Sequence, residues 1–414
     1  MPRLPLEGIR VVDLTAVWAG PYATRMLGDM GAEIIKVEGA ANPDMLRSLA
    51  MLPQPDPRSY NKAGYFNHNN RSKLGCSIDL TKPDGVQLLL NLVAISDVII
   101  ENFRADVMDR FGLGYEAVKA VRPDIVYVSM PGHGKSGPEA HHVAYGTNVE
   151  QLAGLVSVSG YVGDDPHKSG ISYGDPTAGT LAAGAVVTAL LARKRTGKGQ
   201  YVEIAQRESL TNLIGEYVVG YSMNRRIPER IGNRHPWMAP HGCYPAAGED
   251  QWVTIACETD AQFAALAEVM GAPALATDPR FAVLPARHRN QAALDDQIAA
   301  WTAPQDRFAV VAALQARRIP SAPVLTHIDL LADPHLAARG FFERPRHTEA
   351  GEWPMEGPVF RFKTSEPHLQ RNGPCFAEHN DYVFKDLLGL SAAEVEDFYQ
   401  RGVIATEPNM SGHQ

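Results

Sequence analysis

An acidic residue stands at the start of a long apolar run, in the segment Ser172–Gly179, which reads SYGDPTAG. Proline suits the first position of a helix because its missing N–H would have no partner there, so Asp175 is predicted to be the N-cap of a helix that begins at Pro176. Backbone donors and the positive end of the helix dipole then favour the ionised carboxylate. Such a residue is often only a cap, but an ionised carboxylate held at a helix start is also a candidate nucleophile.

Competing chemical motifs near this segment are incomplete. Gly134–Ser136 resembles the end of a phosphate-binding P-loop, but Ser129 stands where that loop needs its first glycine. Gly170–Gly174 fits the GxSxG pattern of serine hydrolases, yet residues 164–169 are loop formers, and that motif needs a buried strand before it. The nearby histidines have no acidic partner at metal-ligand spacing, and the cysteines form no CxxC pair, so no metal site is predicted: His133, His141, His142, Cys76, Cys243, Cys257 and Cys375.

The composition is that of an ordinary globular protein. With 414 residues the chain can form two or three domains, or one large domain with an insertion. A formal net charge of -8 and the lack of a long Lys/Arg run argue against nucleic-acid binding. Residues 1–7 contain no apolar signal core, and we find no uninterrupted apolar run of about 18 residues, so a cytoplasmic protein without a membrane partner is predicted.

The elements that must position Asp175 follow an alternating pattern. Residues 9–14 and 33–37 are predicted strands on either side of a helix at 20–30, which indicates a βαβ unit, parallel strands and a Rossmann-like sheet. The turn at 15–20 holds one glycine where the dinucleotide fingerprint needs three, which disfavours a nicotinamide enzyme. The alternation continues with strands at 76–80, 97–100, 125–130 and 201–205 and helices at 82–94 and 176–192.

The second half of the chain changes in character. Residues 232–242 are irregular, and a strand at 252–256 begins a smaller unit with helices at 260–270, 290–301 and 308–316. Apolar strands near 359–362 and a helix set from residue 381 complete the predicted elements.

Several short motifs resemble, in the same order, those of the class III CoA-transferase family, the group of formyl-CoA transferase, carnitine CoA-transferase and α-methylacyl-CoA racemase. The resemblance covers nearly the whole chain and extends to Gly174–Gly179 around Asp175. The other motifs are Leu6–Asp13, Ala19–Pro21, Gly31–Glu38, Asn70–Lys73, Ile78–Leu80, Glu101–Phe103, Thr196–Gln200, Glu378–Asn380 and Leu388–Ser391.

The resemblance implies an acyl-CoA:carboxylate CoA-transferase whose catalytic residue is Asp175. In the family this carboxylate attacks an acyl-CoA thioester, an aspartyl anhydride forms, CoA returns to the aspartyl group, and the acceptor acid then takes the CoA. The implied partners are an acyl-CoA and a carboxylic acid. Coenzyme A is then a substrate, and no permanently bound cofactor is expected.

The resemblance also assigns binding residues. The CoA-contact positions of the family correspond to Val17, Ile78, Asn102, Phe103, Arg110 and Phe111. Gly39 and Thr81 depart from the Arg and Lys common at those positions, which leaves the phosphate contacts open. In the substrate pocket, represented here by Trp18, Tyr145 and Gly146, formyl-CoA transferase has Gln and Glu where Trp18 and Gly146 stand. A less polar pocket favours a bulkier, more apolar acyl group than formate or oxalate.

The implied architecture is an α/β fold in an interlocked homodimer. Residues 1–215 and 345–414 form a large Rossmann-like domain from both chain ends, and residues 216–344 form a smaller inserted α+β domain with its linkers. One alternative is a racemase or epimerase of the same family, but Tyr145 stands where the racemases have their His, and tyrosine is a poor base at neutral pH. Another is a CoA-binding partner subunit without activity, which the retained Asp175 disfavours.

Overall fold

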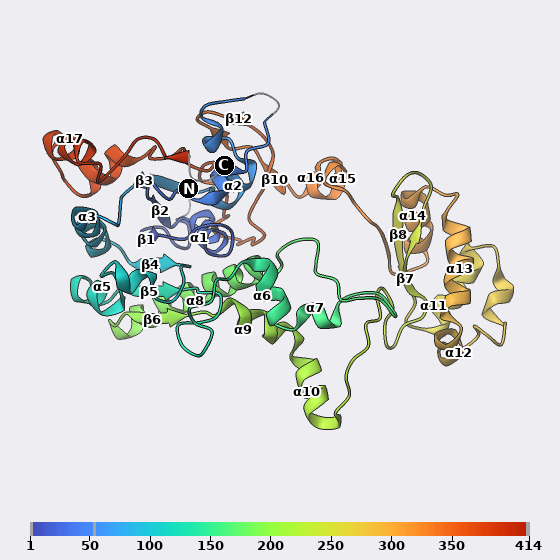
Figure 1. Cartoon of the computed structure of the whole chain (residues 1–414). Helices are drawn as coiled ribbons and strands as arrows, with labels where there is room; N and C mark the ends of the chain where they lie inside the picture. The colour runs from blue at the N-terminus through green and yellow to red at the C-terminus, as the bar shows by residue number, and fades with distance from the viewer. Residues whose placement is uncertain (1–2, 53–54, 411–414) are drawn as a thin grey trace. The chain divides into compact units, whose positions relative to one another are not determined.

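A parallel six-stranded sheet forms the centre of the larger of two compact units, in a computed structural model that describes residues 3–52 and 55–410 (Figure 1). The strand order is β3-β2-β1-β4-β5-β6. The predicted α/β class with a parallel sheet is therefore confirmed. The strands are β1 Arg10–Asp13, β2 Glu33–Glu38, β3 Lys73–Ser77, β4 Val98–Glu101, β5 Val126–Ser129 and β6 Gln200–Glu203.

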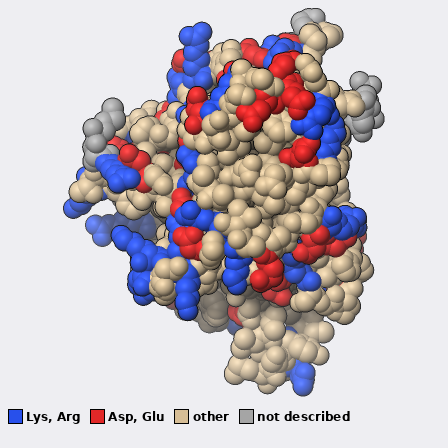
Figure 2. Space-filling model, turned by 90° about the vertical axis from the view of Figure 1, so that its left-hand side faces the viewer, with Lys and Arg blue, Asp and Glu red and all other residues tan. Residues whose placement is uncertain are grey.

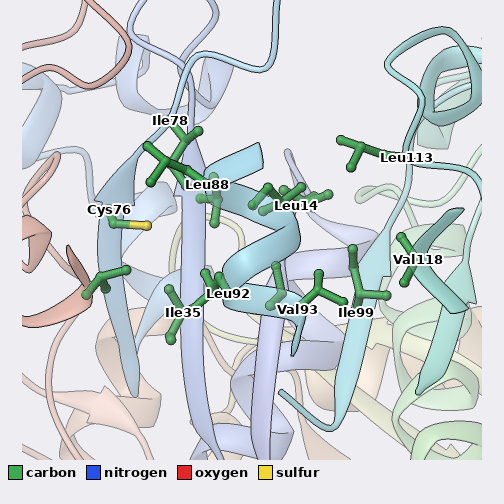
Figure 3. Close-up of a cluster of buried hydrophobic side chains, with 14 of the residues drawn as sticks. Leu14, Ile35, Cys76, Ile78, Leu88, Leu92, Val93, Ile99, Leu113 and Val118 are labelled. Carbon is green, nitrogen blue, oxygen red and sulfur yellow. The ribbon is translucent and has the colours of Figure 1, made fainter. Parts of the chain in front are cut away.

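Helices cover both faces of this sheet. Because side chains alternate along a strand, Val11 packs on one face and its neighbour Val12 on the other. The face of Val11 is covered by α1 Ala19–Asp29 and α8 Gly174–Thr196. The opposite face is covered by α3 Pro83–Ala94, α5 Tyr115–Val121 and α17 Ala392–Gln400, with side chains of the strands and of α3 in contact (Figure 3).

The strand order has a topological switch point between β1 and β4. β1 pairs with both β2 and β4. From β1 the chain continues to β2 on one side of this point, and from β4 it continues to β5 on the other side. In open parallel sheets, ligands bind beyond the carboxyl ends of the strands at such a switch point. The loops after β1 and β4 begin there, at residues 14 and 102.

The C-terminal segment of the same unit runs beside β3. The N–H of Ser72 donates to the Arg371 carbonyl at 3.0 Å, and the N–H of His379 donates to the Gly75 carbonyl at 2.8 Å. A π-helical turn, Tyr382–Leu387, follows. Further elements of this unit are α2 Gly64–Asn70, α4 Val107–Arg110, α6 Gly146–Leu152, α9 Gln206–Thr211, α10 Gly215–Asn224, the 3-10 helices η1 Met45–Ser48, η2 Ser59–Asn61 and η3 Asn212–Ile214, and the short strand pairs β10 Phe342–Glu343 with β13 Met355–Glu356 and β11 Arg346–His347 with β12 Gly351–Glu352.

The second unit contains residues 157–167 and 227–334 and has its own core. An antiparallel sheet in the order β7-β8-β9 packs with helices there. The chain crosses between the units four times: within α7 Leu155–Val158, after residue 167, after residue 226, and at the start of α16 Pro334–Ala338. The predicted domain boundaries at 216 and 344 stay predictions. The elements are β7 His241–Pro245, β8 Trp252–Ala256, β9 Ser321–Pro323, α11 Asp260–Val269, α12 Leu284–Arg289, α13 Gln291–Thr302, α14 Arg307–Ala316 and α15 His327–Ala332.

Of the predicted strands, one is wrong and another is displaced. Residues 359–362, all described, form no strand, and their apolar side chains line an open cavity of about 1280 Å³. Pro358 precedes them and has no N–H to donate to a strand pair. The strand predicted at 76–80 lies at Lys73–Ser77 instead, because Asp79 accepts the N–H of Thr81 at 3.0 Å and turns the chain.

Helix α8 is 23 residues long and is apolar enough to cross a membrane by length and composition. Buried core helices pass the same test. Residues of α8 from Ala178 to Leu190 pack in one cluster with α1 and the sheet. One face of α8 is thus part of the core, whereas Leu181, Val187 and Leu191 of the same helix are exposed.

Charge is mixed on the face that Figure 2 shows. Lys and Arg side chains lie next to Asp and Glu around a largely uncharged centre. Over the described residues of this face, no continuous basic stripe is visible, in keeping with the net charge of -8.

Candidate active site

Asp175 lies in the first turn of α8, as its second residue. The prediction that it is the N-cap is wrong: Tyr173 holds that position, and no side chain caps the helix start. The helix begins two residues early because Pro176 still falls in the first turn, where its missing N–H needs no intrahelical acceptor. The carboxylate of Asp175 is therefore free to turn toward neighbouring elements.

Close packing of two helices brings Asp175 to the start of α1. A Cβ at Gly179 would lie 2.5 Å from the carbonyl oxygen of Ala19, so only glycine permits this approach. The backbone N–H of Ala19, the first residue of α1, is close enough to the Asp175 carboxylate to lower its pKa. The starts of α1 and α8 thus meet at one carboxylate, which is 7% exposed.

The electrostatic environment of Asp175 differs from the prediction. Burial raises its pKa to about 6, and the negative charge of Glu150 adds to the rise. The N–H groups of Ala19 and of Asp175 itself lower the pKa, but by less. The expectation that the helix start favours the ionised form is therefore wrong in its net direction, because desolvation outweighs the backbone donors. A pKa near 6 still leaves the carboxylate largely ionised at neutral pH.

Gly146, the first residue of α6, provides the space for this carboxylate. A Cβ at Gly146 would lie 1.9 Å from Asp175 Oδ2 and 2.6 Å from Ser172 Cβ. These distances are far below any van der Waals contact, so a side chain at position 146 would displace Asp175. Of the predicted pocket residues, Gly146 is in direct contact with Asp175, whereas Tyr145, the N-cap of α6, is 58% exposed.

An aromatic pair lies beside the same carboxylate. The rings of Trp18 and Tyr65 meet edge to face, with centroids 5.6 Å apart. Burial raises the pKa of Tyr65 to about 12, and the negative charges of Asp175 and Asp44 add to the rise. Tyr65 thus keeps its phenolic proton and can donate it. Sequence reasoning missed Tyr65, which lies in α2 and reaches the site only through the fold.

Trp18 brings an unused donor to the site. Its indole Nε1 is buried and has no hydrogen-bond partner among the described residues. A buried donor without a partner is unfavourable, and a ligand oxygen can supply the missing acceptor.

The loop between β1 and α1 is fixed at the switch point. Asn102, just after β4, accepts the N–H of Ala16 and donates to its carbonyl, both at 2.8 Å. Val17 has a φ of 68°, which is rare for a β-branched residue, and its N–H donates to the two carboxylate oxygens of Asp44 at 3.1 and 3.2 Å. The buried Lys36 ammonium lies 3.1 Å from Asp44 Oδ2. Backbone strain held in place by such contacts is common at functional sites.

The other predicted CoA-contact residues lie in different surroundings. Ile78 is buried in the core beneath the sheet edge, and Phe103 and Phe111 pack partly buried against the same core. The Arg110 side chain is 62% exposed and lies 3.3 Å from Asp106. The fold therefore brings Val17 and Asn102 together. The role of all six residues in CoA binding stays a prediction.

No group of three or more His, Cys, Asp or Glu side chains in residues 3–52 and 55–410 has the arrangement of a metal site. The site built around Asp175 consists of carboxylates, aromatic rings and backbone donors. Its chemistry is that of a nucleophilic carboxylate near hydrogen-bond donors.

Comparison with known proteins now adds to this geometry. Residues 6–380 match the family model described as CoA-transferase family III. The chain belongs to this family. It is 34% identical over 403 residues to succinyl-CoA--D-citramalate CoA-transferase of Chloroflexus aurantiacus, an alignment that covers 97% of this chain and 99% of that protein. It is 36% identical over 381 residues to succinyl-CoA:mesaconate CoA-transferase of Haloarcula hispanica, with 90% of this chain and 94% of that protein covered.

A solved structure supports the same assignment. The crystal structure of a CAIB/BAIF family protein from Brucella suis matches with a TM-score of 0.85 and 33% identity, and covers 93% of this chain and 100% of that one. This family III member is an enzyme that transfers CoA, with an acyl-CoA and a carboxylic acid as its substrates. The family resemblance inferred from the sequence is therefore confirmed.

Proposed function

We propose that this enzyme transfers CoA from succinyl-CoA to a methyl-branched, four-carbon-backbone dicarboxylic acid, with Asp175 as the covalent nucleophile. The observation that carries the proposal is the burial of Asp175 near the starts of α1 and α8; Trp18, whose indole N–H has no partner among the described residues, directly precedes α1. A raised pKa makes this carboxylate more basic, and hence a better nucleophile, than an exposed one.

The proposed reaction proceeds through two mixed anhydrides and one CoA thioester of Asp175. A carboxylate oxygen of Asp175 attacks the thioester carbonyl carbon, a C–O bond forms, and the C–S bond breaks to release CoA thiolate and leave a mixed anhydride. The thiolate attacks the aspartyl carbonyl, and succinate leaves with the electron pair of the broken C–O bond. The acceptor carboxylate then attacks the carbonyl carbon of the aspartyl thioester, a C–O bond forms, and the C–S bond breaks to release CoA thiolate and leave a second mixed anhydride. A last thiolate attack on the acceptor carbonyl carbon of this anhydride forms the new CoA thioester, breaks the C–O bond to the aspartyl group and frees the Asp175 carboxylate.

Two similar proteins and two aromatic side chains support this substrate class. The relatives in Chloroflexus and Haloarcula are named for citramalate and mesaconate, which are methyl-branched dicarboxylic acids. The indole N–H of Trp18 can donate to the carboxylate that does not react, and the rings of Trp18 and Tyr65 can contact the methyl branch. We therefore replace the broader preference for an apolar acyl group by this dicarboxylate.

A substrate panel tests the proposal. Succinyl-CoA is incubated with mesaconate, both citramalate enantiomers, glutarate, oxalate and butyrate, and the acyl-CoA products are identified by mass spectrometry. Transfer to the branched dicarboxylates should exceed transfer to oxalate and butyrate at least tenfold. Hydroxylamine should trap an adduct at Asp175, and Asp175→Asn should abolish both transfer and adduct. Full transfer by Asp175→Asn would refute the nucleophile assignment.

Trp18→Phe tests the recognition of the second carboxylate. This change keeps an aromatic ring and removes the N–H donor, so KM for the dicarboxylate should rise roughly tenfold, the effect of one lost hydrogen bond to a charged group. KM for succinyl-CoA and kcat should change less. Equal effects on a monocarboxylate acceptor would show that Trp18 does not bind that group.

The assembly and the rival activity have their own tests. We also propose the interlocked homodimer, which predicts one species at twice the chain mass of 45.1 kDa that persists on dilution in sedimentation velocity. A stable monomer would contradict it.

Incorporation of deuterium at the α-carbon of an acyl-CoA without CoA transfer would instead support the racemase alternative.

A further inference from the structure

Glu150 is a buried carboxylate that the reaction scheme above does not use. It lies in α6 with an exposed fraction of 0%, and no Lys, Arg or His of the described residues lies within 4.0 Å of it as an ion-pair partner. A buried, unpaired carboxylate is costly and needs other hydrogen bonds. Those bonds come from the segment that leads into α8.

The bonds of Glu150 attach it to the chain just before Asp175. Its carboxylate accepts the N–H of Tyr173, the N-cap of α8, and its oxygens lie 3.1 and 3.2 Å from the Ser169 hydroxyl, which also lies 2.5 Å from the Ile171 carbonyl oxygen. Tyr173 stands two residues before Asp175. The position of the helix start, and with it that of the Asp175 backbone, therefore depends on Glu150.

Two residues on one face of α6 act on the Asp175 site. Gly146 and Glu150 are four residues apart, so they lie on the same side of the helix. Gly146 leaves the space that Asp175 Oδ2 occupies, and Glu150 supports the turn that precedes Asp175. The same helix face thus sets both the position of the nucleophile and its electrostatic surroundings.

We propose that Glu150 is a positioning residue for Asp175. Glu150 holds the 169–173 segment, and its buried negative charge favours the acylated form of Asp175 over the free Asp175 carboxylate. This inference rests on the proposed function, in which Asp175 is acylated. It adds a role for a residue of α6 that does not itself touch the reacting atoms.

The charge balance of acylation gives the physical reason. When an Asp175 oxygen bonds to the acyl carbon and the C–S bond breaks, the negative charge leaves with the thiolate, and the aspartyl group becomes neutral. Repulsion from Glu150 is present before this step and absent after it. The other groups that face Asp175 are the phenol of Tyr65 from α2 and the N–H of Ala19 from α1, and neither carries a negative charge. The rise in the Asp175 pKa caused by Glu150 reports the same repulsion.

Glu150→Gln in the full-length protein separates charge from shape. The amide oxygen of Gln can still accept the Tyr173 N–H, so the segment stays attached while the charge is removed. In Glu150→Gln, the acid limb of the plot of kcat/KM against pH should move about one pH unit lower. The fraction of Asp175 that hydroxylamine traps at neutral pH should fall roughly tenfold, because both quantities depend on the repulsion between Glu150 and the Asp175 carboxylate. Glu150→Asp keeps the charge and should keep the limb near its wild-type pH.

Glu116→Gln is the matched control. Glu116 is exposed in the first turn of α5, so its replacement removes one charge away from the site and should leave both readouts unchanged. An unchanged acid limb and adduct yield in Glu150→Gln would overturn the inference while the proposed function stands. Loss of the adduct in the wild-type protein, or its survival in Asp175→Asn, would refute the proposed function itself. If Glu150→Gln does not fold, Glu150→Asp provides the test. A shift of its kcat/KM acid limb by a full pH unit to lower pH would overturn the inference.

Discussion

Replacement of Gly146 by Ala is the sharpest test of the site geometry. The change adds a single methyl group at the start of α6, and that carbon would lie 1.9 Å from Asp175 Oδ2. Non-bonded carbon atoms make favourable contacts at about 3.5 Å, so the Asp175 carboxylate has to move by more than ~1 Å. Ser172 Cβ, at 2.6 Å, blocks relaxation of the new methyl toward that side.

The expected magnitude follows from this displacement. A reacting group misplaced by about 1 Å can lose ~10²-fold in rate, which corresponds to about 2.7 kcal/mol of activation free energy. We therefore expect kcat/KM for CoA transfer to fall ~10²-fold in Gly146→Ala. Overpacking should lower the free energy of unfolding by about 1–3 kcal/mol.

The assay compares steady-state CoA transfer, adduct yield at Asp175 and the midpoint of thermal unfolding in three proteins. Gly220→Ala serves as the control, because a Cβ at this position of α10 meets no atom within 4 Å and should leave transfer unchanged. Wild-type kcat/KM in Gly146→Ala would refute the conclusion that Asp175 is held against α6. A folded variant with lost activity and lost adduct would support it.

Three further predictions follow from the same site. The kcat/KM for transfer should fall tenfold per pH unit below about 6 as Asp175 takes up a proton, and a pH-independent rate between pH 5 and 7 would contradict this. Because the pKa of Asp175 is raised from 3.8 to about 6 in the folded state, that state binds the proton more tightly than the unfolded chain, so the contribution of Asp175 to stability is largest below pH 3.8 and is lost as the pH rises through 6. Asp175→Asn should accordingly be more stable than wild type at pH 8, by as much as about 3 kcal/mol, and this difference should shrink toward pH 5 in thermal unfolding. Asn102→Asp removes the donor to the Ala16 carbonyl and should raise KM for the CoA thioester and lower the unfolding midpoint, which kinetics and calorimetry can measure; an unchanged KM would show that the β1–α1 loop does not bind the thioester.

Much of the main sheet could be predicted from local sequence pattern. The strands at 9–14 and 33–37 and the helix at 20–30 correspond to β1, β2 and α1 within one or two residues. Short β-branched runs next to amphipathic helices leave few alternatives in a chain with this alternation. The segment 359–362 shows the limit, because its apolar residues form no strand with any of the described residues.

The sequence pattern predicted only part of the site. The motif around Asp175 identified the residue, but the local view assigned it an N-cap position and a favoured negative charge. Tyr65 and Glu150 carry no recognisable motif, and they affect Asp175 only because α2 packs against α1 and α6 packs against α8. No spacing along the chain encodes these contacts.

The amino-acid sequence by itself determined the class of fold, the family and the identity of the acidic residue at the start of a small-residue helix. Those properties depend on local pattern and on motifs in a fixed order. Only the tertiary structure decided what that aspartate experiences: the N–H of Ala19, the space left by Gly146 and the buried charge of Glu150. The physical reason is that the pKa and position of a buried carboxylate depend on desolvation and on atoms within a few ångströms, which here come from helices that are distant in the sequence.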